Sequence, residues 1–201
     1  MTDLFQKVSD SQDAFKKLAS KIPGFDGYIE RQNRRAADKL LRETVADRFQ
    51  ALWTRASELQ IDMVNEGMIE FLDDMERAAI QLRTFSDKIR TASYGYSGAF
   101  DAIKINEDEL AQLYAYDQGF FLAADEIERA LDNVEASLYD ETGLPAAIRH
   151  IVSVAREASA ALEGRAELLT ANGEERNEYQ DTSVDQTAEE DTDTTDNESA
   201  D

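Results

Sequence analysis

A single apolar seam between residues 110 and 138 constrains the fold more than any other feature of the sequence. Its positions alternate in steps of three and four residues, which is the spacing of one buried face of a long α-helix. The same alternation is the heptad pattern of helices that cross at about 20°. The seam consists of Leu110, Leu113, Asp117, Phe120, Ala124, Ile127, Leu131, Val134 and Leu138.

Three further stretches carry apolar stripes with helical spacing. They predict helices from about 27 to 65, from about 68 to 92, and from Pro145 to about 171. Between the first two, Gly67 predicts a break at which the glycine adopts a left-handed conformation. The alternative is one uninterrupted helix that tolerates the glycine.

The two ends of the chain differ from its middle. Residues 1–22 predict a short amphipathic N-terminal helix, which Pro23 and Gly24 end. Residues 172–201 hold twelve acids and one base, with too little apolar area to offset the entropy of ordering, so we expect a disordered acidic tail. Residues 23–171 then form the helical domain.

The expected fold is all-α. It is an elongated up-and-down antiparallel bundle of three to four long helices, with the short N-terminal helix added to it. Because the connections are short, we expect consecutive helices to be antiparallel neighbours.

The charge of the chain limits its partners. The 201 residues include 43 acids and 21 bases, and the net charge of −22 disfavours nucleic acid and anionic surfaces. The absence of cysteine excludes disulfides and cysteine-ligated metals. No signal peptide and no spanning run of ~18 apolar residues is present, so we expect a cytoplasmic protein. An acidic chain with little lysine is also typical of a high-salt cytoplasm.

Positive charge is concentrated at the start of the first long helix, at Arg31, Arg34, Arg35 and Lys39. These residues predict a docking face for an acidic partner or for the acidic tail itself. The alternative is a solvated face whose charges neighbouring acids balance.

The stretch 93–104 departs from the helical pattern. Tyr94 and Tyr96 flank a glycine and Phe100 follows, so we expect a packed corner between two long helices. These aromatic residues are a candidate recognition patch, and local packing at the end of the bundle is the alternative. The glycines do not form a phosphate loop, since no strand precedes them and no Lys-Ser/Thr follows.

Asp117 is the one polar residue in the 110–138 seam. A buried carboxylate costs several kcal/mol unless it is paired or protonated, so we expect Arg, Lys or a Tyr hydroxyl from a neighbour as its partner. Its expected role is to fix the helix register, with catalysis as the alternative. His150 is the only histidine and lacks the Glu-x-x-His spacing of a di-iron bundle, so we expect no metal and no cofactor.

Three segments resemble markers of an uncharacterised helical protein family in prokaryotes. They are Ile22-Pro23-Gly24-Phe25-Asp26-Gly27-Tyr28, Arg34-Arg35-Ala36-Ala37-Asp38-Lys39-Leu40-Leu41-Arg42 and Tyr94-Gly95-Tyr96-Ser97-Gly98-Ala99-Phe100-Asp101. The resemblance spans residues 15–140 and leaves the acidic tail out. The family has no established activity, so the resemblance implies one coherent helical domain and no chemistry.

These patterns together predict a non-enzymatic interaction or scaffold protein that binds a protein partner or associates with itself. No Ser-His-Asp or Cys-His set can be assembled from one histidine and no cysteine. One alternative is a peripheral membrane adaptor that uses residues 1–22, where lysines flank the apolar face but acids weaken attraction to lipid. The other is a ligand binder or enzyme with a site around Asp117.

Overall fold

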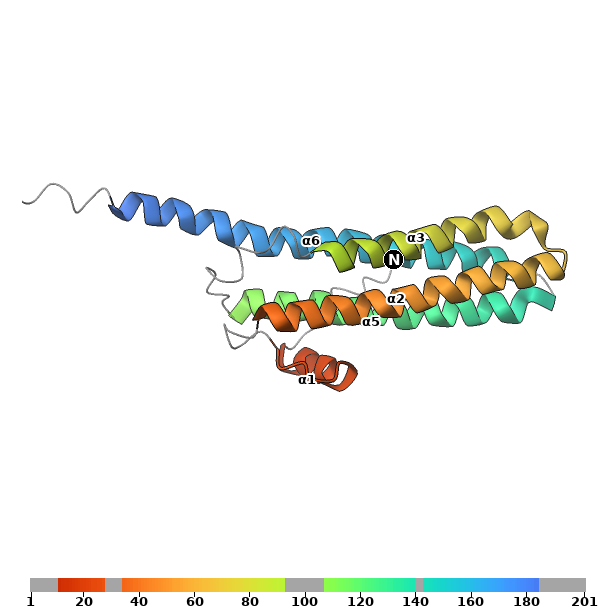
Figure 1. Ribbon diagram of the computed structural model, residues 1–201, viewed down its shortest axis with the longest axis horizontal. Coiled ribbons are helices and arrows are strands. Elements are labelled where there is room, and N and C mark those ends of the chain that lie inside the picture. Colours follow the sequence, from red (N-terminus) through yellow and green to blue (C-terminus); the bar gives the residue numbers. More distant parts are fainter. Residues whose placement is uncertain (1–10, 28–33, 93–106, 140–142, 185–201) are drawn as a thin grey trace, which may run out of the picture.

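The structure, a computed structural model, describes residues 11–27, 34–92, 107–139 and 143–184 (Figure 1). This part of the chain contains helices and no strand, so the predicted all-α fold is confirmed. The helices are α1 (Ser11–Lys21), α2 (Arg34–Asn65), α3 (Leu72–Thr91), α5 (Glu107–Ala136) and α6 (Leu144–Val184), with the short 3-10 helices η1 (Ile69–Phe71) and η3 (Ser137–Tyr139).

The four long helices lie side by side in an elongated bundle (Figure 1). As predicted, α2 and α3 form one antiparallel hairpin and α5 and α6 another. The hairpins pack with α2 beside α5 and α3 beside α6, and both of these pairs are parallel. Ion pairs mark the parallel register, because Arg48 with Asp125 and Arg55 with Asp132 both join residues 77 positions apart.

The expectation that all consecutive helices are neighbours is wrong for α3 and α5. These two helices lie diagonally across the bundle, and their contact runs through the core, where the rings of Phe85 and Phe120 are 5.6 Å apart. The physical reason is the length of their connection. The fourteen residues from 93 to 106 can span roughly 45 Å, which is ample to cross the end of a four-helix bundle.

Large apolar side chains fill the interior. The seam predicted in α5 is buried from Leu113 to Leu138, and Leu110 packs half-buried at its start. At the centre, Phe85 lies between Phe49, with ring centroids 4.2 Å apart, and Phe120. Burial of each such side chain stabilises the fold by about 1.5–3 kcal/mol, so these contacts hold the hairpins together.

The turn between α2 and α3 is closed by glycine, as the sequence predicts. Gly67 has φ of +82°. The N–H of Met68 donates to the Met63 carbonyl at 2.8 Å, and the N–H of Gly67 donates to the Val64 carbonyl at 3.2 Å. These two bonds form the Schellman motif, in which a left-handed residue ends a helix. Both methionines are buried, so the turn is also anchored in the core.

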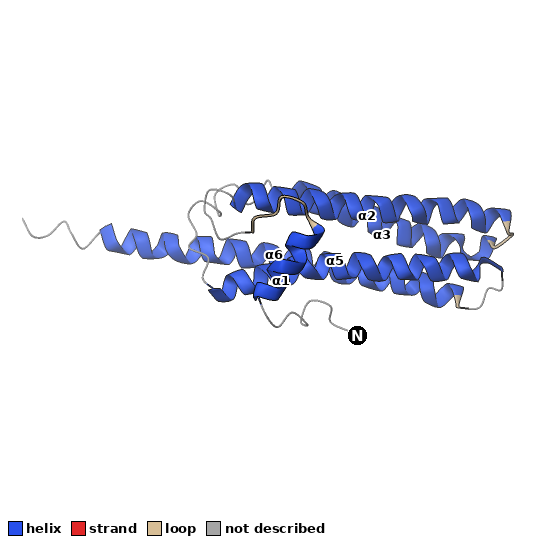
Figure 2. Ribbon diagram, turned by 90° about the horizontal axis from the view of Figure 1, so that it is seen from below, coloured by secondary structure: helices blue, strands red, loops and turns tan. Residues whose placement is uncertain are grey.

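Helix α1 lies against α5, at the end of the bundle where α2 begins (Figures 1 and 2). Its apolar face, with Ala14, Leu18 and the following Ile22, is buried there. Lys21 Nζ lies 2.9 Å from Asp125 Oδ2, which adds an ion pair to the apolar contact. The bundle therefore covers the apolar face of the predicted N-terminal helix at Ala14, Leu18 and Ile22, whereas residues 1–10 lie outside the described residues. No helix in the described ranges is long and apolar enough to cross a membrane.

Helix α6 is longer than predicted. It continues to Val184 instead of ending near 171, and its last turns extend past the other helices (Figures 1 and 2). The expected disorder from 172 onward is therefore wrong as far as 184. Glutamate, arginine and glutamine, which occur at five positions between 172 and 184, are good helix formers, and a helix already nucleated by packed turns propagates at little cost. Residues 185–201 lie outside the described residues.

Candidate functional site

A chain of charged side chains crosses the bundle interior near the start of α2. Arg165 Nε donates to Asp117 Oδ1 at 2.8 Å, and Arg165 Nη2 donates to Asp38 Oδ1 at 2.8 Å. The other oxygen of Asp38 accepts from Arg42 Nε at 2.7 Å. We call Asp38, Arg42, Asp117 and Arg165 the buried ion network.

The network also reaches the fourth helix. Arg42 Nη1 donates to the carbonyls of Ile89 and Arg90, at 3.5 and 3.3 Å, in the last turns of α3. A helix C-terminus carries partial negative charge on such carbonyls, so the arginine is favourably placed. Side chains of α2, α5 and α6 and the backbone of α3 thus meet in one hydrogen-bonded set.

Burial decides what this network contributes. Arg165 is 1% exposed and Asp117 0%, so both charges are fully removed from water. Desolvation of buried ions costs several kcal/mol each, and the mutual attraction offsets it only where every charge is paired. Two arginines and two aspartates pair here with no net charge. The network therefore adds no large surplus of stability, and the role of Asp117 in fixing the helix register stays a prediction.

The predicted partner of Asp117 is thus an arginine from a neighbouring helix. The sequence reasoning missed Arg165 itself, although a signal was present. Arg165 lies three residues after Leu162 and four before Leu169, on the apolar stripe of α6. Asp38 likewise lies three residues before Leu41 on the stripe of α2. A charged residue at a position of an apolar helix stripe indicates a buried ion pair.

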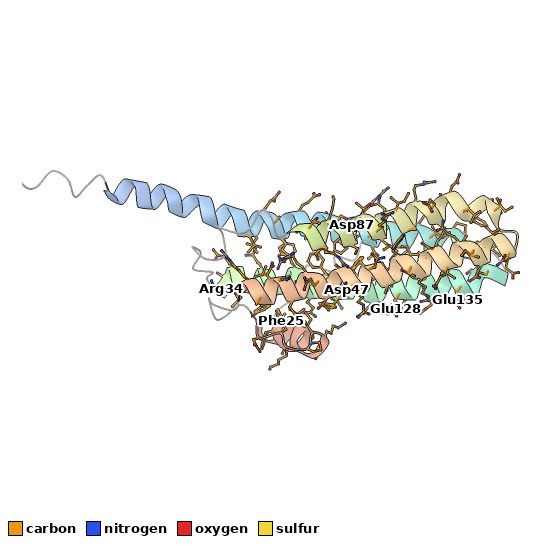
Figure 3. The ribbon with its side chains drawn as sticks, in the orientation of Figure 1. Phe25, Arg34, Asp47, Asp87, Glu128 and Glu135 are labelled. Atoms are coloured by element: carbon orange, nitrogen blue, oxygen red, sulfur yellow. The ribbon has the colours of Figure 1, made fainter. Side chains whose placement is uncertain are left out.

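The predicted basic face is only partly a surface. Arg34 is buried at the start of α2 (Figure 3). It turns inward because Arg34 and Asp38 share one helix face by their spacing of four. Arg35 and Lys39 are exposed, and Lys39 Nζ lies 3.7 Å from Glu43 Oε1. Arg31 lies outside the described residues, so two of the four predicted residues form an exposed basic face.

The structure adds little on the other candidate residues. Tyr94, Tyr96 and Phe100 lie outside the described residues, and the aromatic patch stays a prediction. His150 Nε2 lies 2.8 Å from Glu126 Oε1 on the surface, where it bridges α6 and α5. Within the described ranges, no three His, Cys, Asp or Glu side chains gather as a metal site would require.

The contact between α1 and α5 is tight at one glycine. Gly27 has φ of +76°, and a Cβ added there would lie 2.6 Å from Tyr114 Oη and 2.8 Å from Phe15 Cε2. Further along α5, Gln118 Oε1 is buried without a hydrogen-bond partner among the described residues. An unsatisfied buried oxygen costs about 1–3 kcal/mol, so Gln118 lowers the stability of the fold.

The outer edge between α2 and α5 is a row of ion pairs. Arg48 pairs with Asp125 and Glu128, and Arg55 pairs with Asp132 and Glu135. Glu128 and Glu135 lie along this edge of the bundle (Figure 3). Desolvation opposes the charge of Arg55, but its hydrogen bonds to Glu135 and Asp132 outweigh it and raise the pKa of the guanidinium above its ordinary value. Exposed pairs of this kind fix register more than they stabilise.

The α2–α3 hairpin exposes apolar side chains near its turn and further along α3. Ile61 is 64% exposed, Val64 52%, Ile69 67% and Ile80 49%. We call these four residues the hairpin surface. Between 56 and 76 the chain has no lysine or arginine and seven acids, namely Glu58, Asp62, Glu66, Glu70, Asp73, Asp74 and Glu76.

Comparison with known proteins gives no relative. No family model, no curated protein and no solved structure matches the chain. The resemblance of its three sequence segments to a helical family therefore stays a prediction.

Proposed function

We propose that the chain is a non-enzymatic helical-bundle protein that acts as an interaction or scaffold module, with the hairpin surface as its contact site. One observation carries this proposal. All the large apolar side chains that the structure describes as exposed lie on the α2–α3 hairpin. Exposed apolar side chains that gather in one place, with polar residues around them, are typical of protein interaction sites.

The local charge supports one kind of partner. The seven acids between 56 and 76 are interspersed in the sequence with Ile61, Val64 and Ile69, so this part of the hairpin surface carries negative charge. A partner that fits this surface presents an apolar stripe flanked by lysine or arginine, as a basic amphipathic helix does. Opposite charge at the rim would speed the encounter, and burial of the apolar side chains would supply the affinity.

The buried ion network supports a scaffold over an enzyme. Arg165 holds Asp117 in the interior and also bonds Asp38, so a substrate would have to displace a fully buried arginine to reach either carboxylate. Such a network suits a rigid frame whose surfaces make the contacts.

A comparative capture experiment tests the proposal. The full chain is immobilised, exposed to a lysate of the source organism at low salt, and the captured proteins are quantified by mass spectrometry. The substitutions Ile61→Ser and Ile69→Ser should lower capture of the specific partner at least tenfold. The matched control, Ala51→Ser with Ala160→Ser, changes two exposed apolar positions elsewhere and should leave capture unchanged.

A third immobilised variant separates the hairpin surface from the basic face formed by Arg35 and Lys39. Charge reversal at Arg35 and Lys39 should not affect the partner of the hairpin surface. Loss of capture by that variant, with full capture by the Ile61 and Ile69 variant, would contradict the proposal and favour the basic face.

A further inference from the structure

A second surface of the bundle has the opposite character. The groove between α3 and α6 holds about 520 Å³ and is lined by Arg77 from α3 and by Arg149 and Arg156 from α6. Ile148 and Val152 form its apolar floor. We call this the arginine groove.

The acids of the groove do not neutralise it. Asp74 Oδ1 accepts from Arg77 at 2.7 Å, and Glu157 Oε1 accepts from Ser153 Oγ at 3.2 Å. Arg149 and Arg156 are exposed, and neither makes an ion pair with a described residue. They are seven residues apart, which is two helical turns, so both guanidinium groups emerge on the same side of α6. The arginine groove can therefore take carboxylates while its floor takes apolar groups.

The same chain contains a segment of matching chemistry. Residues 185–201 hold eight acids and no base. In a chain of net charge −22, this segment is repelled by most of the bundle surface. Arg149 and Arg156 in the arginine groove make no ion pair with a described residue, so the groove offers the complementary charge.

Geometry decides which copy of the chain supplies the segment. Arg156 lies 28 residues before Val184, and this length of α6 spans about 42 Å at ~1.5 Å per residue. Seventeen residues reach at most roughly 60 Å when fully extended. A segment that turned back on its own α6 would bring only its last few residues to Arg156 and almost none to Arg149. Full extension would also cost conformational entropy along the whole segment.

A second copy removes this difficulty. If two α6 helices run antiparallel, the part of α6 that extends past one bundle lies beside the other bundle (Figure 2). The acidic segment then follows directly along the partner's α6 toward its arginine groove. The arrangement is reciprocal, so one twofold axis produces two identical contacts.

We propose that the arginine groove binds the carboxylate-rich segment 185–201 of a second copy, so that two chains form a reciprocal dimer through their α6 helices. This contact rests on residues separate from the hairpin surface. Failure of the dimer would therefore leave the proposed partner of the hairpin surface untouched, and the reverse also holds.

Sedimentation equilibrium of the full chain tests the proposal. At about 50 mM salt the wild type should show twice the 22.6 kDa of one chain, and at 1 M salt it should dissociate because the contact is between charges. The variant R149E/R156E should weaken the dimer at least about tenfold. The control K17E/R129E changes the net charge equally at exposed bases outside the groove and should dimerise like the wild type.

A charge exchange completes the test. The variant E189K/E190K/D191K should also be monomeric, and its combination with R149E/R156E in one chain should dimerise again. A monomeric wild type at low salt would overturn the proposal. A dimer that R149E/R156E leaves intact, or a combined variant that stays monomeric, would overturn it too.

Discussion

Arg165 and Asp38 are 127 positions apart in the sequence, yet Arg165 Nη2 lies 2.8 Å from Asp38 Oδ1 in the bundle interior. The two residues come from α6 and α2, which lie diagonally across the bundle, so their bond passes through the core from one hairpin to the other. A shift of either hairpin by one turn would move one charge about 5 Å and break this bond, while Asp38 would keep Arg42 and Arg165 would keep Asp117 within their own hairpins. This relation is the physical basis for a role in register.

Loss of the central arginine should be severe. In Arg165→Met, Asp117 and one oxygen of Asp38 lose their buried cation, and an uncompensated buried charge costs about 3–5 kcal/mol. We expect the free energy of unfolding to fall by that amount in urea titrations followed by circular dichroism. Arg129→Met, at an exposed position of α5, should change it by less than about 0.5 kcal/mol.

Asp117 provides the complementary test of register. Asp117→Leu removes one of the two carboxylates that bond Arg165 in the buried ion network, and we expect lower stability and a mixture of helix alignments. The measurement is the free energy of unfolding together with the oligomeric state. If Asp117→Leu raised the stability and left the oligomeric state unchanged, a role in register would be wrong.

Two glycines before α2 should respond differently to alanine. Gly24 and Gly27 both have positive φ, but only at Gly27 would a Cβ collide, with Tyr114 Oη and Phe15. Gly27→Ala should therefore loosen α1 and speed amide hydrogen exchange in residues 11–21. Gly24→Ala shares the backbone strain and serves as the control, with smaller loss of protection. Equal exchange in the two variants would mean that the close contact does not hold α1.

Gly67 should matter through its backbone alone. Its φ is +82° and a Cβ would meet no atom within 4 Å, so Gly67→Ala introduces strain without collision. The left-handed conformation costs an alanine about 1–2 kcal/mol, and the midpoint of urea unfolding should fall accordingly. Gly67→Asn should lose less, because asparagine tolerates this conformation better. A stabilised Gly67→Ala would show that the turn rearranges.

Membrane binding gives a further test of α1. Because Ala14, Leu18 and Ile22 are buried in the bundle, we expect the full chain not to sediment with liposomes of phosphatidylcholine and phosphatidylglycerol at low salt. Leu18→Asp should release α1 without creating lipid binding. Sedimentation of the wild type, abolished in a chain that begins at Gly24, would instead support the peripheral adaptor.

The spacing of apolar residues predicted the helical fold, because the positions of the seam in α5 and of the stripes in the other helices are the positions that become buried. Gly67 was predictable for a different reason, since few residues besides glycine adopt its conformation. The diagonal placement of α3 and α5 was not predictable, because a stripe shows that a face is buried and not which helix covers it.

The site was harder to predict than the fold. Asp117 was recognisable as a lone acid in an apolar seam, and its need for a cation followed from desolvation. The sequence predicted Arg34 at the surface because its neighbours Arg35 and Lys39 are charged too. Adjacent positions on a helix point in directions about 100° apart, so a run of bases is divided between the interior and the surface.

The sequence separations across the bundle set an order in which the helices can meet. Gln60 and Glu76, which join α2 to α3, are 16 positions apart, whereas Arg48 and Asp125, which join α2 to α5, are 77 apart. The entropy of closing the longer loop costs about 1.4 kcal/mol more than that of the shorter one. Each hairpin should therefore form before the two dock, and the contact between Arg165 and Asp38, with the largest separation of all of these, becomes available only in the final step of folding.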